Sequence, residues 1–172
     1  MAAGATYTPI ATTTLGSNQA NGYLIFSSIP STYTDLRLII STRSTNASST
    51  DDLYVRFNGS STGYSWTYLH GNGTAAASSR ASSQNVALLG FGLAAASATS
   101  GIFDSVNADL NNYSNTTTYK TMLSRYSTQG YVGADVSLWQ STAAINSITL
   151  YWISGQNFAT GSTFTLYGIS SA

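Results

Sequence analysis

The sequence predicts an all-β protein built as a single antiparallel β-sandwich, jelly-roll-like, with about ten strands. Short runs rich in β-branched and aromatic residues recur along the chain, separated by clusters of Gly, Ser, Asn and Thr. Helix signals are weak, because Glu is absent, Lys occurs once, and no long segment keeps a helical apolar period. Aromatic residues make up 12% of the chain, so it is predicted to fold although only 7% of its residues are charged.

Six segments alternate apolar and polar side chains in the manner of half-buried strands. They are 35–41, 53–58, 105–110, 132–138, 148–152 and 163–167. In the first, Leu36 and Leu38 share the apolar side, and in the fourth Val132, Val136 and Leu138 do so. Each segment is expected to place its apolar side on the core.

A turn and three weaker segments complete the predicted set of strands. Asn58-Gly59 is a pair that tolerates positive φ, and it predicts a hairpin from 53–58 into a strand at 64–68. The weaker strand candidates are 23–27, 85–91 and 119–126.

No Pro-rich linker, charge block or shift in composition divides the chain, so residues 1–172 are predicted to form one domain. The first dozen residues, 1–12, are expected to form an arm that orders against a neighbour. The segment 75–84, which holds Arg80 among Ser and Ala, is expected to be a long exposed loop. The Ala-rich stretch 93–98 is the one place where a short helix is expected.

Composition argues against several classes of partner. Six basic residues balance six acidic ones, so no cationic excess is present to neutralise phosphates, and nucleic-acid binding is not expected. No apolar run is long enough to cross a membrane as a helix. A neutral surface of Ser, Thr and Asn suits packing against neighbours, which favours a component of a larger assembly.

The sequence offers little for catalysis, and no enzyme activity or cofactor is predicted. It holds one histidine, no cysteine and no Gly-x-Ser-x-Gly motif. His70, before Gly71-Asn72-Gly73, is interpreted as a packing residue at a strand end. A zinc site is disfavoured because zinc needs several Cys or His ligands. A pair of aspartates acting on a glycosidic bond is a remote alternative.

Asp51 and Asp52 form the one adjacent acidic pair. In a loop rich in Ser and Thr they could supply oxygen ligands to calcium. Capping of a turn or of a strand start is the favoured interpretation, because no EF-hand spacing surrounds them.

Tyr64, Trp66 and Tyr68 are candidates for an aromatic row on one strand face. Such a row could stack sugar rings, or it could belong to the core or to a subunit interface. Three arginines on the polar sides of their strands are expected to pair with nearby Asp groups or to contact a neighbouring subunit, and these are Arg37, Arg56 and Arg125. Arg80 is a further candidate for an interface or a ligand, as are Arg37 and Arg56.

Four phrases of the sequence resemble small virion proteins of tailed phages, including marine phages and cyanophages. They are FSSIPSTYTDLRL (26–38), LYVRFNG (53–59), NYSNTTTYK (112–120) and STFTLYGI (162–169), and the resemblance extends over most of the chain. Such proteins include head decoration, or cement, proteins and the tips of tail fibres.

The resemblance implies a capsid decoration protein on the capsid exterior of a virion. Its partners would be the major capsid protein and itself, as a homotrimer. The alternative is a tail-fibre or receptor-binding tip that recognises glycans on the host surface, and copy number per particle separates the two.

Overall fold

A computed structural model describes residues 6–170, which form twelve strands and no helix. The strands are β1 (Tyr7–Thr14), β2 (Tyr23–Phe26), β3 (Asp35–Thr42), β4 (Thr50–Phe57), β5 (Tyr64–Gly71), β6 (Ala76–Gln84), β7 (Ala87–Ala94), β8 (Asp104–Asn111), β9 (Lys120–Ser127), β10 (Val132–Trp139), β11 (Ile148–Trp152) and β12 (Thr163–Ile169). The described residues therefore include no helix that could span a membrane.

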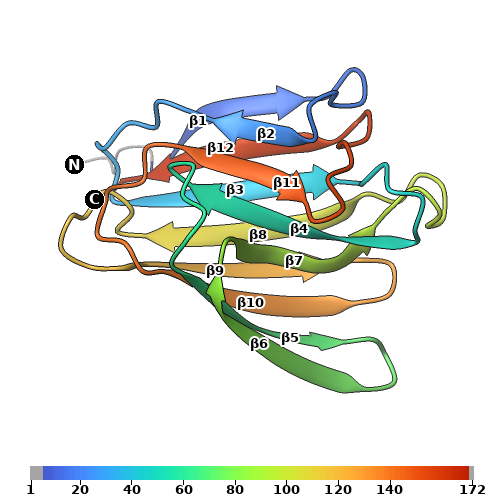
Figure 1. The fold of residues 1–172 in the computed structure, drawn as a ribbon. Helices are drawn as coiled ribbons and strands as arrows, with labels where there is room; N and C mark the ends of the chain where they lie inside the picture. The colour runs from blue at the N-terminus through green and yellow to red at the C-terminus, as the bar shows by residue number, and fades with distance from the viewer. Residues whose placement is uncertain (1–5, 171–172) are drawn as a thin grey trace.

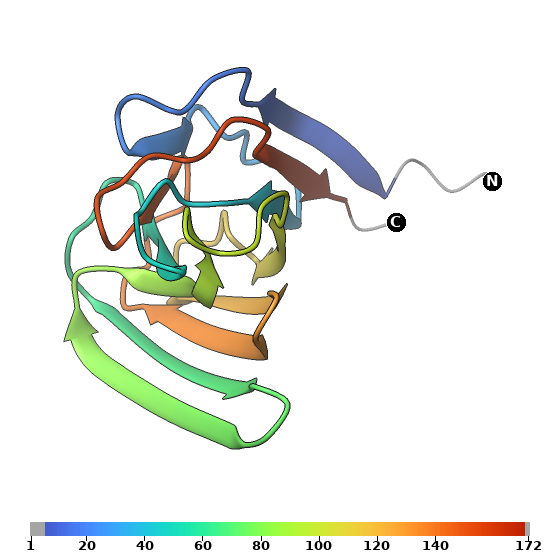
Figure 2. The same cartoon turned by 90° about the vertical axis from the view of Figure 1, so that its right-hand side faces the viewer.

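Two antiparallel sheets stack face to face and confirm the predicted jelly-roll-like sandwich (Figure 1). The large sheet has eight strands in the order β1-β12-β3-β8-β9-β10-β5-β6, and the small sheet has four in the order β2-β11-β4-β7. The small sheet lies over one face of the large one, while the β5–β6 hairpin projects beyond it in both views (Figure 2). Among residues 6–170, no element covers the other face of the large sheet.

The core fills the space between the sheets. In β3 the side chains of Leu36, Leu38 and Ile40 point inward and are at most 1% exposed, as the alternation predicts. Trp152 on β11 and Phe164 on β12 meet them from the small sheet and from the neighbouring strand, and both are fully buried. Burial of such side chains is worth roughly 2 kcal/mol each, so this layer carries most of the stability.

β10 is the exception to the predicted facing. Its apolar side, with Val132 at 64% and Val136 at 50% exposure, points to solvent. Its inner side carries Gly133, Asp135 and Ser137, all buried. Pairing with β9 and β5 fixes the register of β10, and a strand held between two neighbours cannot turn over to hide its apolar side.

The predicted hairpin at Asn58-Gly59 is wrong in its pairing, although the turn itself forms. Both residues have positive φ, at 52° and 67°, and the Ser60 N–H donates to the Phe57 carbonyl over 2.9 Å. The turn leads from β4 in the small sheet to β5 in the large sheet, so it joins the two layers. Two-residue loops favour hairpins only when the following residues pair back, and here the chain continues to Gly63 before β5 begins.

Two strands escape the sequence pattern, and both are edges of the large sheet. The predicted loop 75–84 is instead β6, paired with β5, and its side chains are nearly all exposed. Within the predicted arm 1–12, Tyr7 begins β1, which pairs with β12, and residues 1–5 lie outside the described part of the chain. The predicted short helix at 93–98 is absent, because these residues end β7 and then turn.

Arg43 fastens the loop between β7 and β8. Its guanidinium is buried and donates to the carbonyl oxygens of Ala96, Ala98, Thr99 and Ile102 at 2.8–3.1 Å. A planar group with five donors can hold several carbonyls at once, which an ammonium group cannot do in the same geometry. The loop is thus ordered by one side chain that no sequence motif indicates.

Candidate functional site

The uncovered face of the large sheet is the main candidate site. Over β9, β10 and β5 it exposes four large apolar side chains to solvent, and they are Leu69, Leu123, Val132 and Val136. Large apolar side chains gathered on one uncovered sheet face are typical of an interaction surface.

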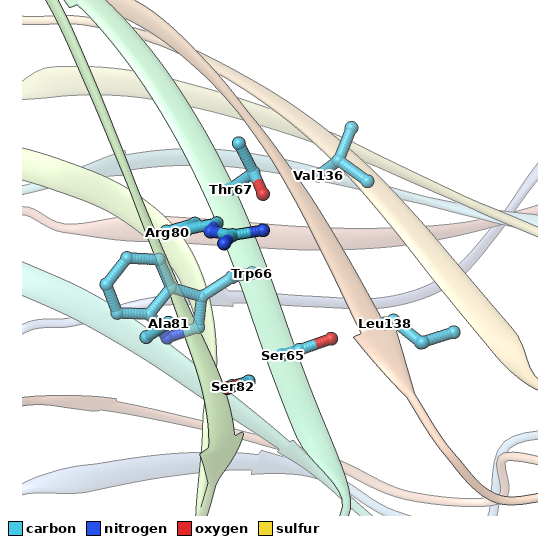
Figure 3. Close-up of a pocket in the computed structure, with 8 residues that line it drawn as sticks. All are labelled: Ser65, Trp66, Thr67, Arg80, Ala81, Ser82, Val136 and Leu138. Carbon is cyan, nitrogen blue, oxygen red and sulfur yellow. The ribbon is translucent and has the colours of Figure 1, made fainter.

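A groove of about 400 Å³ lies on this face where β6, β5 and β10 run side by side. Figure 3 shows its side chains, with the Arg80 guanidinium extending across β5 toward Val136. The lining consists of Ser65, Trp66, Thr67, Arg80, Ala81, Ser82, Val136 and Leu138. The groove thus combines one cation, several hydroxyl groups and aliphatic walls.

A wider hollow of about 660 Å³ continues along the same face around Arg125 and Arg37. Arg37 is engaged within the chain, because its Nε lies 3.4 Å from Asp109 Oδ1 and its Nη1 donates to the Tyr7 hydroxyl over 3.1 Å. Arg125 is exposed and has no ion pair or hydrogen bond to any described residue. Arg80 is likewise exposed and has no ion pair or hydrogen bond to any described residue. Two arginines of this face are therefore free to contact a partner.

The predicted aromatic row divides between two environments. Tyr64 lies in the main core, where its ring stacks on Trp139 at 6.1 Å and its hydroxyl accepts the Phe57 N–H over 2.9 Å. Burial raises the pKa of Tyr64 to about 12. Trp66 and Tyr68 are half-buried and point to the inner side of the hairpin, so the row presents no continuous aromatic surface to solvent.

Trp66 and Tyr68 belong to a second aromatic group beside the edge strand β7. Tyr68 stacks on Phe91 with ring centres 4.8 Å apart, and His70 stacks on Phe91 at 5.0 Å. Tyr131, from the β9–β10 turn, meets His70 edge-on at 5.3 Å. The rings fill the angle between the hairpin and the small sheet and hold the hairpin in place, which accounts for the predicted packing role of His70.

Asp135 lies beneath these rings on the inner side of β10 and is 1% exposed. Its Oδ2 accepts the Ser124 hydroxyl over 3.3 Å, and its Oδ1 has no hydrogen-bond partner among the described residues. Burial raises the pKa of Asp135 to about 7. The carboxyl group is too enclosed to act on a substrate, but its protonation bears on stability.

Asp51 and Asp52 sit at the start of β4 and are bound by the chain. Asp51 Oδ2 accepts the hydroxyls of Ser44 and Ser154 at 2.7 and 2.5 Å, and Asp52 Oδ1 accepts the Gly92 N–H at 2.8 Å. Burial raises the pKa of Asp52. Within residues 6–170 no three or more His, Cys, Asp or Glu side chains are grouped so as to hold a metal ion.

A hollow of about 330 Å³ opens beside this acidic pair. Phe91 and Tyr131 form an aromatic wall. The other lining residues are Asn46, Thr50, Asp51, Asp52, Gly92, Ile153 and Ser154. Sequence inspection does not indicate this hollow, because its walls come from loops and strand ends that are far apart in the chain.

Arg56 lies apart from the other candidate arginines, on the outer side of the small sheet. Its guanidinium carbon is 5.1 Å from the centre of the Tyr151 ring, and its Nε donates to the Asn85 carbonyl over 3.1 Å. Of the predicted interface residues, Arg37, Arg80 and Arg125 therefore share one face, and Arg56 does not.

Comparison with known proteins finds no matching family model and no matching curated protein. Among solved structures, the chain is similar to the galectin LEC-6 of Caenorhabditis elegans, with 9% identity, a TM-score of 0.34, and coverage of 90% of this chain and 94% of that one. It is also similar to a protein of unknown function from Shewanella oneidensis, with 7% identity, a TM-score of 0.26, and coverage of 98% and 77%. At these scores neither likeness supports a statement about function.

Proposed function

We propose that this chain is a non-enzymatic structural protein of a tailed-phage particle, and specifically a capsid decoration protein that binds the major capsid protein lattice. The observation that carries the proposal is the facing of β10, which turns its apolar side outward on an uncovered sheet. No element among residues 6–170 hides this side, and a neighbouring molecule would bury it.

Other features fit a role in assembly. The surface is polar but poor in charge, so neighbours approach it without strong repulsion or loss of ion hydration. Many copies that each bury a modest area give a large total stabilisation of a particle. Self-association as a closed homotrimer is part of this proposal, and it comes from the resemblance of the sequence phrases to decoration proteins.

The proposal is tested by cryo-electron microscopy of purified particles of the phage that encodes the protein. A decoration protein is expected on the head lattice in numbers comparable to the capsid subunits. Density for this fold only at a tail tip, or nowhere on the particle, would exclude the decoration role.

The alternative is a receptor-binding tip that recognises host glycans, and the hollow beside Asp52 favours it. Aromatic walls with carboxylate and amide groups at their rim are suited to a sugar ring. One face of the sugar would stack on the aromatic rings, and its hydroxyl groups would hydrogen-bond to the carboxylate and amide groups. A glycan array with the wild-type protein and Tyr131→Ala tests this function. Binding that is lost in the variant supports it, and a blank array with folded wild-type protein excludes it for the glycans tested.

A further inference from the structure

The uncovered sheet face carries a defined patch, here called the open-face patch, made of Leu69, Leu123, Val132, Val136, Arg80 and Arg125. The four apolar side chains lie on β5, β9 and β10, with Arg125 on β9 and Arg80 on β6. The strand registers place Arg80 and Arg125 three strands apart, with an offset of two residues along the strands. This corresponds to a separation of about 16 Å between their Cα atoms. Two free cations therefore flank an aliphatic strip.

No aspartate side chain is free to meet these arginines. All six acidic residues are aspartates. Asp51, Asp104 and Asp135 are buried, and Asp109 pairs with Arg37. Asp35 accepts the Asn112 N–H over 2.7 Å, and Asp52 accepts that of Gly92 on the other sheet. A second copy docked patch to patch would bring arginines together without counter-charges, so the charge pattern disfavours self-association through this face.

The patch also lacks the features that sugars use. Every aromatic side chain of β5 and β9 points to the inner side of the large sheet, and these are Tyr64, Trp66, Tyr68 and Tyr126. Aliphatic branches such as Val132 and Val136 complement apolar protein side chains, whereas saccharide rings favour flat aromatic faces.

We infer that the open-face patch binds an acidic protein surface, with apolar side chains at its centre and carboxylates that reach Arg80 and Arg125. Under the proposed function this surface belongs to the capsid lattice, and that assignment of the partner rests on the proposed function. The inference that the partner is an acidic protein surface depends only on the side chains of the open-face patch.

The test is titration of the full chain with three polymers, followed by calorimetry and by amide chemical shifts. The probes are a random copolymer of Glu and Ala, polyglutamate, and polygalacturonate as an acidic polysaccharide. We expect the copolymer to bind most tightly, with shifts confined to β5, β6, β9 and β10. Binding should weaken when salt rises from about 0.05 to about 0.5 M, because exposed charges are screened.

Variants assign the binding to the patch. Arg80→Ser with Arg125→Ser should weaken copolymer binding by about tenfold, since each exposed ion pair contributes up to about 1 kcal/mol. The control Ser17→Asp with Ser61→Asp lowers the net charge by the same amount at exposed loop positions outside the patch. Its affinity for the copolymer should stay within about twofold of that of the wild type, because charges beyond a Debye length are largely screened. Val132→Thr with Val136→Thr should reduce copolymer binding to the level of polyglutamate.

The outcomes separate this inference from the proposed function. Equal affinity of the arginine variant and the wild type, or tightest binding by polygalacturonate, would overturn the acidic-protein patch. A positive polymer result together with absence from phage heads would leave the patch standing and remove the decoration role. Head occupancy unaffected by the arginine substitutions would retain that role and reject the patch.

Discussion

β3 and β10 lie in the same sheet and alternate apolar and polar residues equally well, yet they face opposite ways. β3 turns Leu36 and Leu38 to the core, whereas β10 turns Val132 and Val136 to solvent. Alternation thus predicts that a strand forms, but the side that is buried depends on its register with neighbours. β10, whose apolar side faces solvent against the prediction, is the strand that lies in the candidate interface.

The inner side of β10 tolerates burial because its polar groups are small or hydrogen-bonded. Ser137 donates to the Leu88 carbonyl over 3.0 Å, and Asp135 accepts from Ser124. Gly133 leaves room for the ring of Tyr126. The inward positions Gly133 and Ser137 thus suit the inverted facing of β10, whereas Asp135 keeps one buried carboxyl oxygen without a partner among the described residues.

The largest expected difference between the two strands is the cost of truncating their apolar side chains. Leu38→Ala should lower the free energy of unfolding by about 2–5 kcal/mol, because it opens a cavity in the core. Val136→Ala should change it by about 0.5 kcal/mol or less. Chemical denaturation measures both, and comparable losses would show that β10 is buried in the isolated protein.

Asp135 makes the stability of the β10 region depend on pH. Its pKa in the folded chain is raised by burial to about 7, against about 3.9 when unfolded, so the folded state holds the proton more tightly. This contribution to the free energy of unfolding is fully present below about pH 4 and is lost as the pH rises through about 7, and it amounts to roughly 4 kcal/mol.

Asp135→Asn should remove that pH dependence and raise stability at pH 8, whereas Asp109→Asn, on the half-exposed outer side, should leave the slope in place. Denaturation curves at several pH values provide the measurement. An unchanged slope in Asp135→Asn would assign the effect to Asp52 and Asp104, whose pKa values burial also raises.

Gly133 tests how closely the inner side of β10 is packed. A Cβ there would lie 2.3 Å from the Tyr126 hydroxyl oxygen and 2.8 Å from the Leu69 carbonyl oxygen, so Gly133→Ala should cost about 1–3 kcal/mol. Gly16→Ala, at an exposed position with nothing within 4 Å, is the control and should be nearly neutral. Thermal melting compares them, and equal melting temperatures would show that Tyr126 can move aside.

The smallest effect on stability is expected at the free arginines. Arg80→Ser and Arg125→Ser remove exposed side chains without partners, so the free energy of unfolding should change by less than about 0.5 kcal/mol. A loss above 1.5 kcal/mol, measured by urea denaturation, would indicate a structural role and weaken the case for a reserved binding surface.

Sequence reasoning recovers the interior of the fold better than its margins. The ten predicted strands all form, because each has at least one side that packs on the core. It misses β1 and β6, which are edges with little burial and hence no alternation to detect. Residues that act through distant partners, such as Arg43 on its four carbonyls or Tyr131 beside Asp52, leave no local signal.

The strand order also bears on how the chain reaches its fold. β3 lies between β8 and β12, and β12 itself carries β1 on its other side, so residue 35 pairs with residue 169. During synthesis, β1 and the edge of β3 that pairs with β12 stay unpaired until β12 has left the ribosome. Such high contact order predicts slow folding, and the early strands are the segments that need protection from premature association.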